Sequence, residues 1–426
     1  MPPQVTQNIM ERKKVVVVGG GFAGIQLVAH LDENLFDILL IDKLNHHQFQ
    51  PLFYQVATSQ LEPSSISFPF RKIFQYKKNL QIRMAEVTNI DPESNTIHTS
   101  IGPFSYDYLV IATGCKTNFF GNKHLESYTY SLKTTYDSIK IRNSVLQDFE
   151  DLLSVDGEER EYLLNIVIVG AGPTGVELAG AFAEIKRNII PKDYPNIDFK
   201  DLKIILLEGS PHTLSSMSHM AQKTSEKYLR SLGVTVKTGV FVTDYDGNTI
   251  TLNNGETIKS KRMIWAAGVT GNVLPGINKE VVVLNGRLTV NRHNLVKGYS
   301  NIFAIGDVSY METQKYPKGH PQVANVAINQ ARNLARNLKA LQKNKTLREY
   351  EYFNKGSMAT IGKNKAVVDL PFIRFQGYFA WFVWMFLHLM LILSIRNKLI
   401  VFINWAFNYV TKDTSLRLIL QERKPK

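Results

Sequence analysis

One pattern occurs twice in this chain: an apolar run, a glycine motif, a helical stretch, a second apolar run and an acid. The first copy spans Lys14–Asp42, and its motif Gly19–Gly24 matches G-x-G-x-x-G. The run Val15–Val18 predicts a buried parallel strand, Ile25–Leu31 predicts a helix, and Ile38–Ile41 predicts a second strand. This order is typical of α/β proteins with parallel sheets.

Each glycine of the first motif has its own physical role. Gly19 permits a tight turn, Gly21 lets the backbone approach a pyrophosphate, and Gly24 lets the helix pack closely on the strand. The amino end of the helix offers free N–H groups and a positive dipole end to phosphates. Asp42 lies eighteen residues after Gly24, where it can accept hydrogen bonds from a ribose. Together these features favour a dinucleotide site over an ordinary glycine-rich turn.

The second copy spans Asn165–Glu208, with its motif glycines at Gly170, Gly172 and Gly175. Gly175 and Glu208 are thirty-three residues apart, more than the usual spacing of about twenty. The excess is predicted to be a loop insertion at Asn188–Asp201. Two copies imply two bound dinucleotides, one on each of two Rossmann-like domains.

Three further strands are predicted to end at turns that can approach a bound cofactor. One ends at Thr113-Gly114 and a parallel one ends at Gly268. The third ends at Gly306-Asp307, where a carboxylate can reach the hydroxyls of a ribityl chain. The alternatives are a plain strand end for the first two and a helix cap for Asp307.

Composition excludes several classes of site. The single cysteine, Cys115, excludes an intramolecular disulfide and a four-cysteine metal site. His46 and His47 are adjacent but lack a third ligand at matching spacing, so no metal site is predicted. The formal net charge of +13 would suit nucleic acid or an anionic membrane. From Arg374 onward eight basic residues face two acids in an apolar tail, which favours the membrane and no nucleic acid.

The tail contains two apolar segments. Phe375–Ile395 has twenty-one residues without a charged side chain if His388 is neutral, which makes it a transmembrane candidate by length. Leu399–Thr411 has thirteen residues and the pattern of a helix lying in the membrane interface. A few of the tail's aromatic side chains are expected to insert into the membrane, from the set Phe379, Trp381, Phe382, Trp384, Phe386, Phe402 and Trp405.

Several of these stretches resemble the type II NADH:quinone oxidoreductases, which are single-subunit respiratory NADH dehydrogenases that do not pump protons. The resemblance extends from about Lys14 to Leu420. The matching stretches are VVVVGGGFAG, HQFQPLFYQVAT, LVIATG, IVIVGAGPTGVELAG, WAAGV, NIFAIGD, GSMATIGKNKAV and the apolar tail. Only QPLFYQVAT, GSMATIGKNKAV and the tail are specific to this family, because the others occur across two-dinucleotide flavoproteins.

The resemblance implies FAD on the first glycine motif, NADH on the second and a quinone near the flavin. The FAD contacts that it implies are Gly19, Gly21, Gly24, Asp42, Gln50, Thr113, Gly114, Gly306, Asp307 and Ala324. The NADH contacts that it implies are Gly170, Gly172, Gly175, Glu177, Glu208 and Gly268. The quinone contacts that it implies are Gln50, Tyr54, Asn325, Asn329 and Lys363. No metal is expected. A protein truncated after Leu370 is expected to keep its flavin and to reduce a water-soluble quinone.

Two of these residues are candidate catalytic groups. The resemblance places Glu177 near the nicotinamide, and the alternative is a first-turn acid favoured by the helix dipole. Lys363 can support a quinone that gains negative charge, and the alternative is a solvated loop lysine. The predicted helix Pro321–Leu338 departs from the family, because Asn325 and Asn329 stand where relatives have glutamines.

The predicted fold is α/β, glutathione-reductase-like, with two Rossmann-like domains and a C-terminal helical membrane-binding segment. The predicted domains are 1–129 and 291–370 for FAD, 130–290 for NADH and 371–426 for the membrane. The predicted enzyme passes a hydride from NADH to FAD and two electrons to menaquinone or ubiquinone, at the cytoplasmic face of the inner membrane. One transmembrane helix at 375–395, another FAD/NAD(P)H oxidoreductase and a non-catalytic nucleotide sensor stay open, as does a homodimer.

Overall fold

The computed structural model describes residues 11–195, 197–283, 285–414 and 416–421. The chain divides into two compact units. Unit 1 comprises the residues up to 47 together with 68–116 and 269–353, and unit 2 comprises 48–67, 117–268 and the residues from 354 onward. The boundaries therefore differ from those predicted. The earlier part of unit 1 ends at Lys116 rather than at residue 129, its last part begins at Val269 rather than at residue 291, and the tail is grouped with unit 2.

Unit 1 is centred on a parallel sheet with the strand order β21-β9-β1-β2-β5. The central strand contains the first apolar run, whose valines are at most 5% exposed. Val15 and Val17 face a layer that contains α1, α3 and α10, whereas Val16 and Val18 face the small sheet β6-β7-β8. The strands are β1 (Lys13–Val18), β2 (Phe36–Asp42), β5 (Leu80–Met84), β9 (Tyr108–Ile111) and β21 (Ile302–Ala304).

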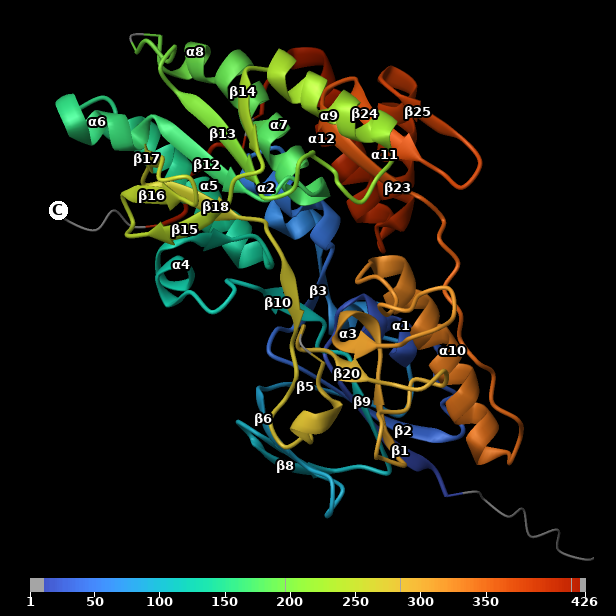
Figure 1. The fold of residues 1–426 in the computed structure, drawn as a ribbon. Helices are drawn as coiled ribbons and strands as arrows, with labels where there is room; N and C mark the ends of the chain where they lie inside the picture. Colours follow the sequence, from blue (N-terminus) through green and yellow to red (C-terminus); the bar gives the residue numbers. More distant parts are fainter. Residues whose placement is uncertain (1–10, 196, 284, 415, 422–426) are drawn as a thin grey trace, which may run out of the picture. The chain divides into compact units, whose positions relative to one another are not determined.

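The remaining elements of unit 1 cover the two faces of this sheet (Figure 1). The helices are α1 (Phe22–His30), α3 (Phe70–Ile73), α10 (Ala324–Gln342) and the 3-10 turns η3 (Lys279–Val281) and η4 (Gly306–Val308). The small strands are β6 (Val87–Asp91), β7 (Thr96–Thr99), β8 (Gly102–Ser105), β20 (Leu288–Thr289) and β22 (Ser309–Tyr310). The chain passes between units near β3 (His46–Gln48), β4 (Ser67–Pro69), β10 (Cys115–Thr117) and β19 (Val269–Gly271).

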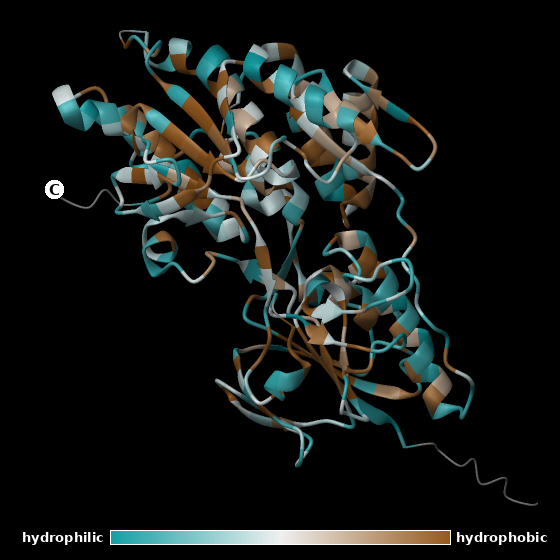
Figure 2. Ribbon diagram, viewed as in Figure 1, coloured by the Kyte–Doolittle hydropathy of each residue, from teal (hydrophilic) through white to brown (hydrophobic). Residues whose placement is uncertain are grey.

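Unit 2 repeats the parallel arrangement with the order β11-β18-β12-β13-β14. Figure 2 shows hydrophobic residues concentrated in its central strands, and all of β12 is buried. The strands are β11 (Tyr130–Ser131), β12 (Asn165–Val169), β13 (Lys203–Glu208), β14 (Val234–Thr238) and β18 (Arg262–Trp265). Helix α7 (Pro173–Asn188) follows the second glycine motif and packs on β23 (Ser357–Gly362). Gly180 permits this approach, because a Cβ there would lie 2.6 Å from the carbonyl oxygen of Ile361.

The other elements of unit 2 form two small antiparallel sheets and a set of helices. The strands are β15 (Val242–Tyr245), β16 (Thr249–Leu252), β17 (Thr257–Lys259), β24 (Lys365–Asp369) and β25 (Arg374–Gln376). The helices before α7 are η1 (Gln50–Leu52), α2 (Phe53–Ala57), η2 (Pro63–Ser65), α4 (Lys123–Tyr128), α5 (Thr135–Asp151) and α6 (Gly157–Leu163). Those after it are α8 (Ile190–Asp193), α9 (His219–Ser231), α11 (Tyr378–Leu391) and α12 (Ile395–Thr411).

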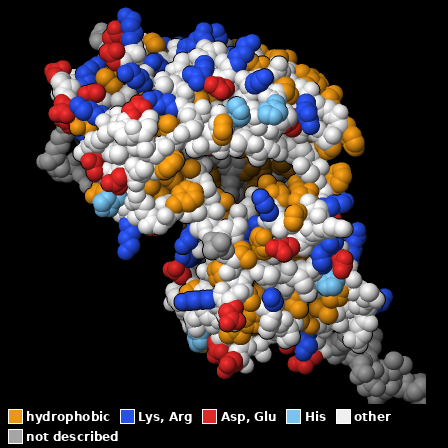
Figure 3. All heavy atoms as spheres, in the orientation of Figure 1, with side chains coloured by type: hydrophobic (Ala, Val, Ile, Leu, Met, Phe, Trp, Pro, Cys, Tyr) orange, Lys and Arg blue, Asp and Glu red, His pale blue; other side chains and the backbone are white. Residues whose placement is uncertain are grey.

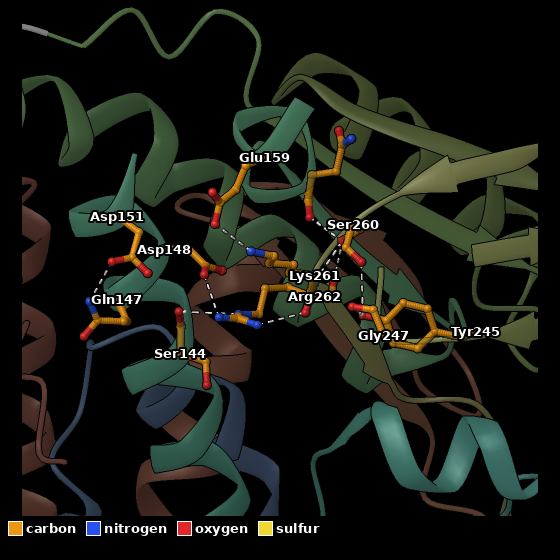
Figure 4. Close-up of polar contacts among 11 residues, drawn as sticks. Ser144, Gln147, Asp148, Asp151, Glu159, Tyr245, Gly247, Ser260, Lys261 and Arg262 are labelled. Carbon is orange, nitrogen blue, oxygen red and sulfur yellow. Dashed lines mark hydrogen bonds and ion pairs between the residues drawn. The ribbon is translucent and has the colours of Figure 1, made fainter. Parts of the chain in front are cut away.

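A buried ion pair ties α5 to the sheet of unit 2 (Figure 4). Arg262 on β18 donates to Asp148 at 2.6 Å and to the carbonyl oxygen of Ser144 at 3.4 Å. Burial raises the pKa of Asp148 to about 7, although Arg262 opposes that rise. Removal of either partner would leave a charged or polar group buried without its bond, so the pair serves to hold α5 in position.

The tail forms two helices, as its two apolar segments predicted. Helix α11 (Tyr378–Leu391) is shorter than the predicted segment 375–395, and α12 begins at Ile395 rather than at the predicted Leu399. Among the described residues, no helix has the length and apolar character needed to span a membrane. Hydrophobic side chains gather at the edge of the molecule near β25 and α11 in Figure 3.

Candidate active site

Asp42 fixes the glycine loop of unit 1. Its Oδ2 accepts a hydrogen bond from the N–H of Gly20 at 2.6 Å, and its Oδ1 accepts one from the N–H of Leu44 at 2.7 Å. Burial raises the pKa of the Asp42 carboxyl, while these two N–H groups lower it. The acid at the end of β2 therefore holds the turn at the end of β1.

Glu208 makes the same pair of bonds in unit 2. Its Oε2 accepts from the N–H of Ala171 at 2.6 Å, and its Oε1 accepts from the N–H of Ser210 at 2.7 Å. Ala171 follows Gly170 as Gly20 follows Gly19. The predicted equivalence of the two sequence units thus extends to individual hydrogen bonds.

The glycines of the first motif separate into two groups. A Cβ at Gly19 would lie 2.4 Å from the carbonyl oxygen of Ala112, and a Cβ at Gly24 would lie 1.8 Å from that of Gly19. Gly19 also has a φ of +105°. A Cβ at Gly21, in contrast, would meet no atom within 4 Å, and its backbone is extended. Packing of the protein explains the first two glycines, whereas the open space beside Gly21 is where the backbone can approach a bound pyrophosphate.

The second motif shows the same separation. A Cβ at Gly170 or Gly175 would clash with backbone at 2.8 Å or less, whereas a Cβ at Gly172 would meet nothing within 4 Å. Helices α1 and α7 begin directly after the open glycines, with no side-chain cap and no acid in the first turn. Their first N–H groups are therefore available to an anion. This geometry fits a pyrophosphate at each motif.

The turns after β9 and β18 also correspond. Gly114 and Gly268 both adopt left-handed backbone, with φ of +68° and +70°. The Thr113 hydroxyl donates to the carbonyl oxygen of Asn272 at 2.6 Å, and the N–H of Asn272 donates to the carbonyl oxygen of Gly114 at 3.0 Å. These bonds hold the Thr113–Gly114 turn within unit 1.

Asp307 lies in η4 of unit 1 rather than at a helix cap. The Cys115 thiol donates to its Oδ2 at 3.0 Å, and Gln322 Nε2 donates to its carbonyl oxygen at 3.0 Å. Gly306, with a φ of +73°, donates its N–H to the buried Oε1 of Gln330 at 2.7 Å. These contacts hold Asp307, whose carboxyl was predicted from the sequence to contact a cofactor, in one position.

Helix α10 begins at Ala324, three residues later than predicted, and it too lacks a side-chain cap and a first-turn acid. Asn325 and Asn329 share one face, as predicted. Asn329 Nδ2 donates to both the carbonyl oxygen and the Oδ1 of Asn325, each at 2.7 Å. The side-chain amides of both asparagines are therefore engaged with each other within the helix.

Unit 2 contains a cavity of about 440 Å³. Its walls come from α2, α7, the β23–β24 turn, α11 and α12. The polar and aromatic lining includes Tyr54, Gln55, Glu177, Glu184, Lys363, Trp384 and Trp405. The structure thus brings three predicted residues together, namely Tyr54, Glu177 and Lys363. Gln50 does not line the cavity, and the asparagines of α10 belong to unit 1.

Glu177 is a buried acid in the second turn of α7, so the alternative of a first-turn acid is wrong. It accepts a hydrogen bond from the N–H of Thr360 at 3.3 Å. Burial raises its pKa to about 8, and the contacts with Thr360 and Trp384 oppose that rise. The side chain is consequently protonated at neutral pH and can donate or accept a hydrogen bond.

Lys363 is not a freely solvated loop lysine. Its ammonium group donates to the carbonyl oxygen of Tyr409 on α12 and lies 3.9 Å from the centre of that ring. Its backbone N–H donates to Glu184. The β23–β24 turn is thereby attached both to α7 and to the end of α12.

Of the seven polar and aromatic cavity residues named above, four were not predicted as site residues from the sequence: Gln55, Glu184, Trp384 and Trp405. Glu184 follows Glu177 by seven residues, which places both acids on one face of α7, and this spacing could have revealed it. Both tryptophans belong to the set of tail aromatics from which membrane-inserting residues were expected. They are 1% and 7% exposed and face the protein, so for these two residues the expectation is wrong. Truncation after Leu370 would remove this wall of the cavity, so retention of soluble-quinone activity is no longer expected.

The two linked sheets with their glycine loops define a class. Residues 13–331 match the pyridine nucleotide-disulphide oxidoreductase family, and residues 354–412 match the NDH2 C-terminal domain. The fold resembles NDH2 of Plasmodium falciparum in complex with NADH, with a TM-score of 0.88 and 23% identity, over 96% of this chain and all of that one. It also resembles sulfide:quinone oxidoreductase of Aquifex aeolicus, with a TM-score of 0.71 and 21% identity, over 95% and 98% of the two chains.

Sequence relatives narrow the class. A type II NADH:quinone oxidoreductase of Mycobacterium tuberculosis is 34% identical, over 96% of this chain and 91% of the relative. The enzyme of the same name from Staphylococcus aureus is 27% identical, over 84% and 89%. The chain belongs to the type II NADH:quinone oxidoreductase family. It is thus a flavin-dependent enzyme that uses NADH and a quinone.

Proposed function

We propose that this NADH:quinone oxidoreductase holds FAD in unit 1, holds NADH and quinone in unit 2, and attaches to the cytoplasmic face of the membrane through α11 and α12. The main support for this proposal is that each unit contains one glycine loop held by an acidic side chain. The acid is Asp42 in unit 1 and Glu208 in unit 2. Bound FAD would supply the redox chemistry, which is hydride transfer from NADH and two-electron reduction of the quinone. The protein supplies binding, orientation and exclusion of water.

The FAD assignment rests on the residues of unit 1. The open space at Gly21 and the free N–H groups at the amino end of α1 can bind the pyrophosphate of FAD. Asp42 can accept hydrogen bonds from the hydroxyls of its adenosine ribose. Asp307 suits the ribityl chain, beside the Thr113–Gly114 turn. The uncapped amino end of α10 at Ala324 suits negative charge on the flavin ring.

The NADH assignment rests on the second loop, and the quinone assignment rests on the cavity. Gly172 and the amino end of α7 suit the pyrophosphate of NADH, and Glu208 suits its ribose. In the cavity, Lys363 and the protonated Glu177 can stabilise a quinone that gains electrons. Gln50, Asn325 and Asn329 stay predicted quinone contacts.

The direct test is a two-step anaerobic experiment with the purified protein. NADH should bleach the visible flavin absorbance, and a subsequent addition of quinone should restore it. Failure of the first step would contradict the NADH assignment. Failure of the second step alone would contradict the quinone assignment and would favour a nucleotide-sensing flavoprotein.

Glu208 should make the enzyme selective for NADH over NADPH. Its carboxylate repels a 2′-phosphate, and residues 209–214 contain no lysine or arginine. We expect kcat/KM to favour NADH by about fivefold to 150-fold, from a charge effect of about 1–3 kcal/mol. Ser210→Arg should narrow the ratio, because the new cation can pair with the phosphate while the Ser210 N–H still binds Glu208. Equal kcat/KM values in the wild type would contradict the assignment.

The outer face of α12 should carry membrane attachment. Phe402, Ile403 and Phe407 are at least 50% exposed, whereas Asn397 and Trp405 on the opposite stripe are buried. Insertion of one exposed phenylalanine contributes about 1.5–3 kcal/mol. Phe402→Asp combined with Phe407→Asp should therefore release most of the enzyme from anionic vesicles in a flotation assay. The matched control, Tyr136→Asp on α5, should stay bound, and equal retention of both variants would contradict the assignment.

A further inference from the structure

Three buried polar side chains link α12 to the cavity wall of unit 2. The indole Nε1 of Trp405 donates to Gln55 Oε1 at 2.8 Å, and Gln55 Nε2 donates to Tyr54 Oη at 2.8 Å. The three residues are 7%, 4% and 5% exposed, and all of them line the cavity. The chain of bonds therefore starts on the membrane-facing helix and ends at a hydroxyl beside the cavity.

The donor and acceptor groups of the three side chains allow this series of hydrogen bonds to run in only one direction. An indole N–H can only donate, so it must meet the oxygen of the Gln55 amide, and the amide NH₂ must then meet Tyr54. Because the Tyr54 oxygen accepts this bond, its own proton is available for a different acceptor. Among the hydrogen bonds of the described residues, none uses that proton. Burial raises the pKa of Tyr54 well above its ordinary value, so the hydroxyl keeps it.

The residues around Tyr54 indicate which kind of acceptor its hydroxyl can bind. The acids that act on Tyr54 are Glu177 and Glu184 of α7, and both raise its pKa. Trp384 lies edge-on to the Tyr54 ring at 6.4 Å between centres. A quinone carbonyl is an acceptor with no proton of its own, and it becomes a stronger acceptor as the ring gains electrons. A buried hydroxyl donor in an aromatic cavity matches that group.

We propose that Trp405 and Gln55 are positioning residues that hold the Tyr54 hydroxyl as a hydrogen-bond donor to a carbonyl oxygen of the bound quinone. This proposal rests on the proposed function, and it adds a consequence to it. Trp405 lies on the inward stripe of the helix whose outer face contacts lipid. Docking of α12 therefore completes the quinone site as well as attaching the enzyme to the membrane.

Gln55→Glu tests the direction of the chain with little change in shape. An ionised carboxylate accepts from both neighbours, which satisfies every buried bond but turns the Tyr54 proton toward residue 55. We expect KM for a water-soluble quinone to rise roughly three- to tenfold at alkaline pH. It should return toward the wild-type value at acidic pH, because a protonated carboxyl can donate as the amide does. A KM equal to that of the wild type at every pH would overturn the proposal.

Trp405→Phe removes the first donor and keeps an aromatic ring. It should raise the quinone KM by a similar factor in detergent, with unchanged NADH-dependent flavin bleaching. The matched control is Asn397→Ala, which removes two hydrogen bonds from α12 to Ser64 and Ser65 but does not touch the cavity. An equal rise in KM in the control would show that helix docking alone matters, and would overturn the proposal.

The proposed function and the positioning role of Trp405 and Gln55 are tested by different measurements. Reduction of quinone by the wild type tests the function, whereas the difference between variants tests the positioning chain. Calorimetric titration of the oxidised enzyme with the same quinone gives a second readout that needs no turnover. Trp405→Phe should weaken the Kd by about the same roughly three- to tenfold factor. An unchanged Kd together with an unchanged KM would overturn the proposal.

Discussion

Asp307→Ala should yield a colourless protein. The carboxyl is held by the Cys115 thiol in a fixed turn of unit 1, and its loss would remove the charge-assisted bonds that we propose it makes to the ribityl chain. Such bonds contribute about 1.5–3 kcal/mol each, so the affinity for FAD should fall at least about tenfold for a single bond. Flavin content per protein after purification measures the effect.

Asp307→Asn is the matched control for that result. The amide keeps an oxygen acceptor and the same shape, so we expect partial retention of flavin and recovery when FAD is added. Circular dichroism should show equal secondary structure in both variants. A full flavin complement in Asp307→Ala would mean that the ribityl chain is bound elsewhere.

Glu177→Gln should flatten the dependence of stability on pH. The folded pKa of about 8 lies above the ordinary value of 4.5, so between these values the folded protein holds a proton that the unfolded chain releases. The contribution of this group is therefore fully present below about pH 4.5 and is lost as the pH rises through 8. Between pH 6 and pH 8 the loss approaches about 2.7 kcal/mol. Glutamine cannot ionise and should remove this part of the slope.

Melting temperature measured against pH provides the comparison. The wild type should lose more stability than Glu177→Gln as the pH rises from 6 to 8. Glu126→Gln, at an exposed position on α4, should follow the wild type. Parallel curves for the wild type and Glu177→Gln would mean that Glu177 is ionised in the folded protein.

The sequence alone determined the two Rossmann-like sheets and most of the residues around their loops. The valine run of β1 and the glycines of both motifs act through sterics between near neighbours, and their effect is visible in one dimension. Asp42 and Glu208 were found for the same reason, because each ends a strand next to its own glycine loop. The family follows from these motifs together with the tail.

Only the tertiary structure decided which residues line the cavity. Its wall combines α2, α7, the β23–β24 turn and both tail helices, which are far apart in the chain. No spacing in the sequence relates Gln55 to Trp405, because their contact depends on how these elements pack. For the same reason, the sequence could not predict that residues 48–67 belong to unit 2.

The tail shows most clearly where sequence reasoning stops. Helix α12 is apolar on the side that packs on protein, at Val401 and Trp405, and on the outer side, at Phe402 and Phe407. Hydropathy cannot distinguish two apolar faces, because a protein interior and a lipid interior both favour the same side chains. The sequence therefore determined that this segment has two apolar faces, but not which face packs on the protein. The fold decided that Trp384 and Trp405 face the protein and that Phe402 and Phe407 are exposed.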